Sequence, residues 1–156
     1  MTPTQAEMDL VLGATYEVRA ALKHVVGPGW WLAVRVDDDG ETSIGTVLHG
    51  GPDSFDMCSG CLVGRDHHVQ ARGEPMRWND FEGRLERCGE WIRPPWVPVD
   101  PTAILAEAAK RAGSWAGVFA EPDGNGWTAW CHSGVGGHGK TARLAALRLF
   151  VEVVRG

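Results

Sequence analysis

The stretch at residues 127–156, WTAWCHSGVGGHGKTARLAALRLFVEVVRG, decides how the C-terminal half of the chain is expected to fold. Its first letters, WTAWCHS, alternate between the two faces expected of a half-buried β-strand. Its last part carries Leu144, Leu147, Val151 and Val154 at the spacing of one helix face. We therefore predict a strand, a glycine-rich loop and a closing helix, in that order.

The loop in the middle of this stretch, GVGGHGKT, matches the G-x-x-x-x-G-K-[ST] pattern through Gly134, Gly139, Lys140 and Thr141. In phosphate-binding loops of this pattern, backbone N–H groups and the N-terminus of the following helix hold a phosphate. A nucleotide hydrolase also needs a further strand that brings an aspartate to a magnesium ion, and nothing after Thr141 supplies one. We therefore expect no hydrolysis. Two interpretations stay open: a glycine-rich turn capped by the helix, or a site that binds a phosphate or nucleotide.

Local signals in the first part of the chain predict a helix followed by a hairpin. Overlapping capping boxes at residues 2–7 predict a helix that closes at the glycines and proline of residues 27–29. Residues 30–37 and 44–48 alternate between apolar and polar side chains, and the dipeptide Asp39-Gly40 joins them. This pattern predicts two antiparallel strands in a β-hairpin.

The middle of the chain combines an irregular segment with another predicted helix. Residues 50–78 show little periodicity, which is unusual inside a compact domain and typical of segments that are functional or held by something. A capping box at residues 79–82 follows. The apolar side chains that would line one side of the resulting helix are Phe81, Leu85, Cys88 and Ile92.

The order of helix, hairpin and helix therefore occurs twice, because residues 100–156 supply a helix, two strands around a turn, and the closing helix. We predict an α+β fold, with antiparallel hairpins or a sheet against which the helices pack. Two duplicated α-β-β-α units are an open alternative. The expected parts are a helix–hairpin–loop–helix half at residues 1–99 and an α-β-β-α half at residues 100–156, in one compact globular unit.

Another group of residues could hold a metal ion. Cys58-Ser59-Gly60-Cys61 is a C-x2-C pair whose glycine eases a tight turn. Either His67 or His68, together with Cys88, would complete a Cys3His set for zinc. Zinc would explain how an irregular segment is held, because metal binding supplies folding energy. Unligated thiols and a disulfide or redox pair are the alternatives, so we expect no cofactor, with zinc as the open option.

Charge and aromatic content indicate the kind of partner. The formal net charge of −5 disfavours direct nucleic-acid binding and favours a protein with a basic surface. The acidic side chains that would face it are Asp37, Asp38, Asp39 and Glu41 at one predicted turn, and Glu121 and Asp123 at another. The alternative is that both clusters are ordinary solvated turns. The chain contains 8 Trp, more than its core requires, so one or two exposed tryptophans at a partner surface are expected.

Residues 100–156 resemble the small α-β-α sandwich domains found in bacteriophage accessory proteins. In those sequences a tryptophan-containing strand precedes a short loop and a final alanine-rich helix. The matching positions here are Trp127, Trp130, Leu144, Ala145, Ala146, Leu147 and Val151. The resemblance implies a fold and an origin in a phage or mobile element, and it makes GVGGHGKT the variable loop before the last helix. It does not extend to the first hundred residues.

Together these observations favour a non-catalytic binding protein over an enzyme, since no G-x-S-x-G elbow or supported Cys/His/Asp set is found. No apolar run is long enough to span a bilayer and no signal-peptide pattern opens the chain, so we expect a cytoplasmic location and no membrane partner. The expected function is a phage-encoded inhibitor of a host defence complex, of the anti-CRISPR kind. A toxin immunity protein, a zinc-stabilised interaction module and a phosphate binder are the alternatives.

Overall fold

The computed structural model describes residues 2–36, 39, 42–47, 57–60, 69–71 and 73–156. Within them lie four helices and several small antiparallel sheets, which confirms the predicted α+β class. The chain forms two compact units: unit 1 comprises Met1–Trp30 and Trp96–Gly156, and unit 2 comprises Trp31–Pro95. The N-terminal helices therefore belong with the C-terminal half, whereas the expected boundary at residue 99 separated them from it.

Unit 1 begins with two short helices, α1 (Gln5–Leu12) and α2 (Tyr16–Leu22), where the sequence predicted one. The predicted capping box forms at Thr4: Glu7 N donates to Thr4 Oγ1 at 3.3 Å, and Thr4 N donates to Glu7 Oε2 at 3.0 Å. Gly13 ends α1, and Thr15 caps α2 by accepting a hydrogen bond from Val18 N. A second local cap therefore splits a continuous apolar stripe into two helices.

Two longer helices complete the α layer of unit 1. Helix α3 (Pro101–Ala112) starts at the cap Asp100 and ends at Gly113, whose φ of 69° is left-handed. Helix α4 (Ala142–Arg155) starts at the cap Thr141 and packs beside α3 and against α1 and α2. The largest fully buried side chains that these two helices contribute are Ile104, Leu147, Leu149 and Phe150.

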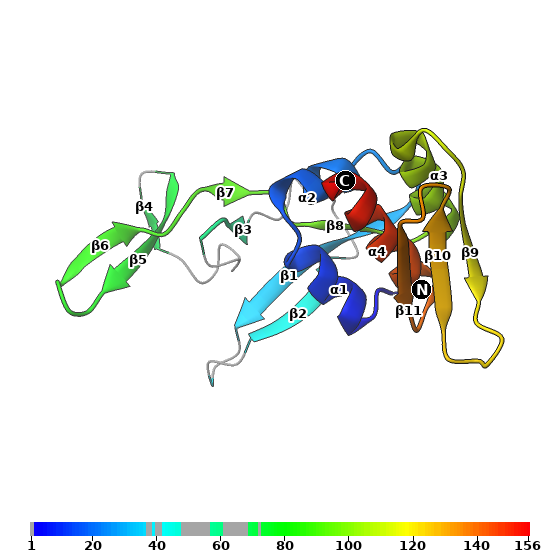
Figure 1. The fold of residues 1–156 in the computed structure, drawn as a ribbon. Helices are drawn as coiled ribbons and strands as arrows, with labels where there is room; N and C mark the ends of the chain where they lie inside the picture. Colours follow the sequence, from blue (N-terminus) through cyan, green and yellow to red (C-terminus); the bar gives the residue numbers. More distant parts are fainter. Residues whose placement is uncertain (1, 37–38, 40–41, 48–56, 61–68, 72) are drawn as a thin grey trace. The chain divides into compact units, whose positions relative to one another are not determined.

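Helix α4 lies against an antiparallel sheet of order β11-β10-β9, formed by β9 (Ala116–Ala120), β10 (Trp127–Cys131) and β11 (Gly136–Gly139) (Figure 1). Strand β11 falls inside the segment that was predicted to be a loop, so that prediction of secondary structure was wrong. Glycines in β11 allow α4 to pack directly against the strand, since a larger residue would collide with the helix. A Cβ on Gly137 would lie 2.5 Å from Leu149 N, and one on Gly139 would lie 2.7 Å from Leu144 Cγ.

The predicted antiparallel pairing of the two N-terminal strands is confirmed, while most of the turn that joins them lies outside the described residues. Strand β1 (Gly29–Val36) pairs antiparallel with β2 (Thr42–Val47), in a register that runs from Trp31↔Val47 to Val36↔Thr42. Within unit 1, β8 (Trp96–Pro98) accompanies the start of β1, where Val99 N donates to Pro28 O at 3.0 Å.

The other described residues of unit 2 include several short strands. A two-stranded ribbon joins β3 (Met57–Cys58) to β7 (Trp91–Ile92). A three-stranded antiparallel sheet has the order β4-β5-β6, with β4 (Val69–Ala71), β5 (Glu74–Asn79) and β6 (Arg84–Arg87). Strands β3, β4 and most of β5 thus occur in residues 50–78, where the sequence showed little periodicity.

The helix predicted from residue 79 to Ile92 does not form, and the capping-box residues make a hairpin turn instead. Asn79 Oδ1 accepts hydrogen bonds from Phe81 N at 3.0 Å and Glu82 N at 3.2 Å. Gly83, at a φ of 62°, donates its N–H to Asn79 O at 2.8 Å and closes the turn between β5 and β6. The same short side chain that caps helices also initiates Asx turns, so the local signal fits both structures.

Candidate functional site

The face of the β9–β10–β11 sheet that points away from α4 carries exposed aromatic side chains. Residues directly opposite each other on neighbouring strands share a face of a sheet, and Phe119 lies opposite Thr128 while Gly117 lies opposite Trp130. The alternate residues Ala129 and Cys131 are buried on the other face, which α4 covers. Phe119 and Trp130 therefore point away from the core.

Three side chains form a cluster here, which we call the aromatic face: Trp115, Phe119 and Trp130. Their exposed fractions are 50%, 42% and 46%. The rings of Trp115 and Trp130 meet edge to face, with centroids 5.2 Å apart and planes at 89°. Phe119 meets Trp130 in the same way at 6.1 Å and 80°. Mutual contacts hold the rings in defined positions although nearly half of their surface is in solvent.

Trp130 stands between two glycines, because its cross-strand partners are Gly117 on β9 and Gly136 on β11. A Cβ on Gly117 would meet no atom within 4 Å, and one on Gly136 would lie 4.0 Å from Trp130 Cβ. No side chain of a directly paired residue therefore covers the indole from either neighbouring strand.

A polar cluster adjoins the aromatic face on the same side of the sheet. Thr128 Oγ1 donates to Glu121 Oε1 and lies 3.2 Å from His138 Nδ1. The distance from His138 Nδ1 to Glu121 Oε1 is 3.9 Å. Glu121 is one of the predicted partner-binding acids, and the structure holds its carboxylate beside the aromatic cluster.

Asp123, the other predicted acid of this turn, is fully exposed between β9 and β10. Its carboxylate accepts hydrogen bonds from Asn125 N and Asn125 Nδ2, each at 3.0 Å. The backbone N–H of Asn125, with the side-chain amide second, holds the pKa of Asp123 below its ordinary value of 3.8. Asp123 and Glu121 therefore place two carboxylates at one end of the sheet.

The other acidic cluster cannot be placed in the same way. Asp37, Asp38 and Glu41 lie outside the described residues, and Asp39 is exposed. Trp115 and Phe119 were not predicted to be members of a site. The signal that could have found them is the alternation of residues 115, 117 and 119, combined with the register to Trp130.

The residues of the phosphate-loop motif are distributed over three structural elements. Gly134 occupies a turn at a φ of 83°, Gly139 is buried in β11, Lys140 is exposed, and Thr141 is the cap of α4. Thr141 Oγ1 accepts from Leu144 N at 3.0 Å and donates to Glu7 Oε1 at 2.6 Å. The carboxylate of Glu7 therefore lies at the start of α4, in the place where the phosphate-loop pattern would put a phosphate.

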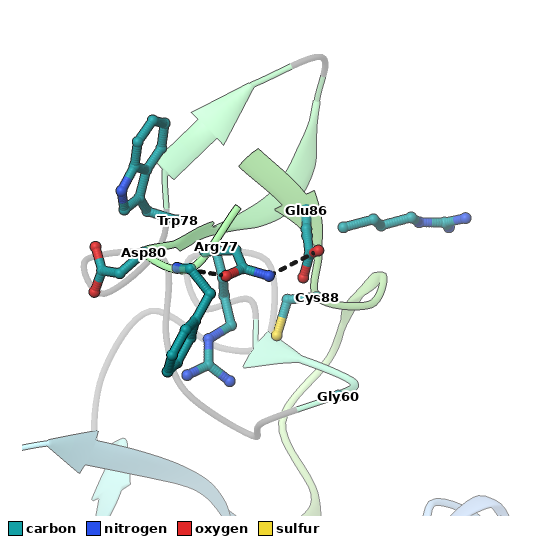
Figure 2. A pocket seen from close by; sticks show the side chains of 9 residues that line it. Gly60, Arg77, Trp78, Asp80, Glu86 and Cys88 are labelled. Carbon is teal, nitrogen blue, oxygen red and sulfur yellow. Dashed lines mark hydrogen bonds between the residues drawn. The ribbon is translucent and has the colours of Figure 1, made fainter. Parts of the chain in front are cut away.

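Unit 2 contains a polar cavity of about 520 Å³ beneath the β5–β6 hairpin. Figure 2 shows Arg77, Glu86 and Cys88 along it, with the turn at Gly60 beside Cys88. Asn79 Nδ2 donates to Glu86 Oε1 at 3.0 Å and fixes one wall. The cavity therefore combines guanidinium, carboxylate and thiol groups.

The predicted zinc ligands are only partly described. Cys58 is buried and Cys88 is half-buried, whereas Cys61, His67 and His68 lie outside the described residues. Within the described part of the chain, no group of three His, Cys, Asp or Glu side chains is arranged to hold a metal ion. Cys131 is buried in unit 1 and lies 2.9 Å from Ser133 Oγ.

Among the helices of the described residues, none has the length and apolar character needed to cross a membrane. Comparison with known proteins adds no relative, since no protein-family model, curated protein or solved structure matches this chain.

Proposed function

We propose that this chain is a protein-binding module and that the aromatic face of unit 1 is its binding surface. The observation that carries the proposal is the cluster of Trp115, Phe119 and Trp130, whose rings meet edge to face and are about half exposed. Tryptophan is enriched among the residues that dominate binding energy in protein interfaces. Because the rings already hold one another, little side-chain freedom is lost on binding.

The charge beside the cluster supports a partner with a basic surface. Glu121 and Asp123 place carboxylates at one end of the same sheet, and the net charge of the chain is −5. Rim charges of this kind increase the rate of encounter and select the orientation of the partner. The most concrete form of the proposal is an inhibitor of a host defence complex, which suits the phage or mobile-element origin that the resemblance implies. A toxin immunity protein has the same requirements.

The test compares three versions of the tagged protein in pull-downs from bacterial lysate: the wild type, Trp130→Ala and Phe81→Ala. Phe81 is fully exposed in unit 2, so its removal controls for the loss of any apolar surface ring. We expect one protein or complex to be retained by the wild type and by Phe81→Ala and lost with Trp130→Ala. With the purified partner, Trp130→Ala should raise the Kd at least about tenfold, which corresponds to about 1.4 kcal/mol.

Two outcomes would contradict the proposal. Equal retention by Trp130→Ala and the wild type would remove the aromatic face from the interaction. Saturable binding of labelled single-stranded DNA or RNA that is lost only with Trp130→Ala would assign the face to base stacking instead.

A further inference from the structure

We propose that Cys58 and Cys88 are two thiolate ligands of a zinc ion that stabilises unit 2. The proposal concerns a different part of the chain from the aromatic face and does not depend on it. It begins from the way in which two short segments, residues 58–60 and 88–90, lie against each other.

Backbone hydrogen bonds align the two segments. Cys58 pairs with Trp91 in the β3–β7 ribbon, and Ser59 N donates to Glu90 O at 2.9 Å. Glu90 N donates in return to Ser59 Oγ at 2.9 Å. The bonds between Ser59 and Glu90 join positions 31 residues apart in sequence, and they bring the turn at Ser59 and Gly60 beside Cys88.

Each of the two segments has a glycine that faces a cysteine of the other. A Cβ on Gly60 would lie 1.9 Å from Cys88 O and 3.5 Å from Cys88 Sγ. A Cβ on Gly89 would lie 2.7 Å from Gly60 N and 3.2 Å from Cys58 Sγ. Only glycine fits at either position. The two backbone segments therefore approach each other closely, and the sulfur atoms of Cys58 and Cys88 both lie next to this contact. Figure 2 shows the sulfur of Cys88 directed toward the turn at Gly60.

The composition of unit 2 supplies a reason for such a site. Among its residues whose side chains the structure describes, the buried apolar ones are Leu32, Met57, Cys58, Pro75, Pro94 and Pro95. Sheets of two or three short strands are marginally stable by themselves and gain from a further cross-link. A structural zinc ion provides that cross-link, because its binding energy is available only to the folded state.

The chemistry of the two sulfurs fits zinc. On binding, each S–H group releases its proton, a Zn–S bond replaces a Zn–water bond, and the two thiolate charges balance the charge of the ion.

The first experiment measures zinc in the full-length protein purified without chelators. We expect about one zinc per chain by elemental analysis, and release of that zinc when thiols are modified. Cys58→Ser and Cys88→Ser should each reduce the bound zinc at least tenfold, whereas Cys131→Ser, which removes the buried thiol of unit 1, should leave the stoichiometry unchanged.

A second measurement does not require the variants to fold. Cobalt added to the metal-free wild-type protein should produce the intense sulfur-to-metal absorption of a thiolate site, and zinc should displace it. Chelation should accelerate amide exchange in residues 57–60 and 84–92 while leaving α4 protected.

The proposal is overturned if the wild-type protein binds neither zinc nor cobalt. It is equally overturned if Cys58→Ser and Cys88→Ser retain full zinc content. This holds whether or not Cys61→Ser, His67→Ala and His68→Ala lose zinc. An intact mass showing a Cys58–Cys88 disulfide in the metal-free, freshly purified protein would assign the pair to oxidation instead.

Discussion

Arg143 and Glu7, which lie 136 residues apart in the sequence, form a buried ion pair in which Arg143 Nε donates to Glu7 Oε2 at 2.7 Å. The side chain of Glu7 is 0% exposed and that of Arg143 is 8% exposed. The guanidinium also donates to Thr2 O at 2.9 Å and to Val99 O at 3.3 Å. The pair therefore connects α1 to the start of α4. Both charges have the hydrogen-bond partners that a buried charge requires.

Removing one member of this pair should strongly destabilise unit 1. Arg143→Met leaves the Glu7 carboxylate buried without its counter-ion, so we expect a loss of about 3–5 kcal/mol in the free energy of unfolding measured in urea. The control is Arg111→Ala, which removes the partly exposed pair with Glu107 and should cost less than about 1 kcal/mol. Equal effects of the two substitutions would contradict the buried network.

The close contact between β11 and α4 makes Gly137 intolerant of any side chain. Gly137→Ala would place Cβ 2.5 Å from Leu149 N and 2.6 Å from Ala145 O, which are backbone atoms that cannot move independently. We expect a decrease in stability of about 1–3 kcal/mol or more, measured by thermal unfolding.

The matched control for this substitution lies on the opposite face of the same sheet. At Gly117, a Cβ would meet nothing within 4 Å, so Gly117→Ala should change stability by less than about 0.5 kcal/mol. If both variants unfold at the same temperature, α4 does not pack on β11 as described.

The turn of the β5–β6 hairpin depends on Asn79. Asn79→Ala removes the acceptor for Phe81 N and Glu82 N and should cost about 1 kcal/mol, as the loss of comparable side-chain acceptors does. Amide exchange at residues 81–83 should accelerate in the variant, with no change in α3. An increase in helical circular dichroism would instead support the helix that the sequence predicted.

Asp123 should titrate below its ordinary pKa. The Asn125 N–H and side-chain amide stabilise the carboxylate, so the group stays charged at pH values where an unperturbed aspartate is half protonated. Because the folded pKa is lowered, the stabilisation is complete above the ordinary value of 3.8 and disappears as the pH falls through the lowered value. Carboxyl NMR should show this midpoint, and Asn125→Ala should raise it; a midpoint at or above 3.8 in the wild type would refute the turn geometry.

Much of the fold could be predicted from signals that act over three or four residues. Thr4 with Glu7, Asp100 before Pro101, and Gly113 all cap helices where the sequence indicated. The strands at residues 29–36 and 42–47 pair as predicted for the same reason, since the alternation of apolar and polar side chains is a local signal. The wrong helix prediction at Asn79 shows where local signals fail. The same side chain can cap a helix or start a turn, and the pairing of β5 with β6 favours the turn.

The sequence by itself determined the α+β class, the positions of the principal caps, and the set of residues able to carry charge, thiol or aromatic chemistry. Only the tertiary structure decided which of them meet. It placed Glu7 on Arg143, gathered Trp115, Phe119 and Trp130 on one open sheet face, and set Cys58 beside the Cys88 segment. The physical reason is that caps and turns depend on neighbours along the chain, whereas ion pairs, ring contacts and glycine approaches depend on strand register and helix packing between distant segments.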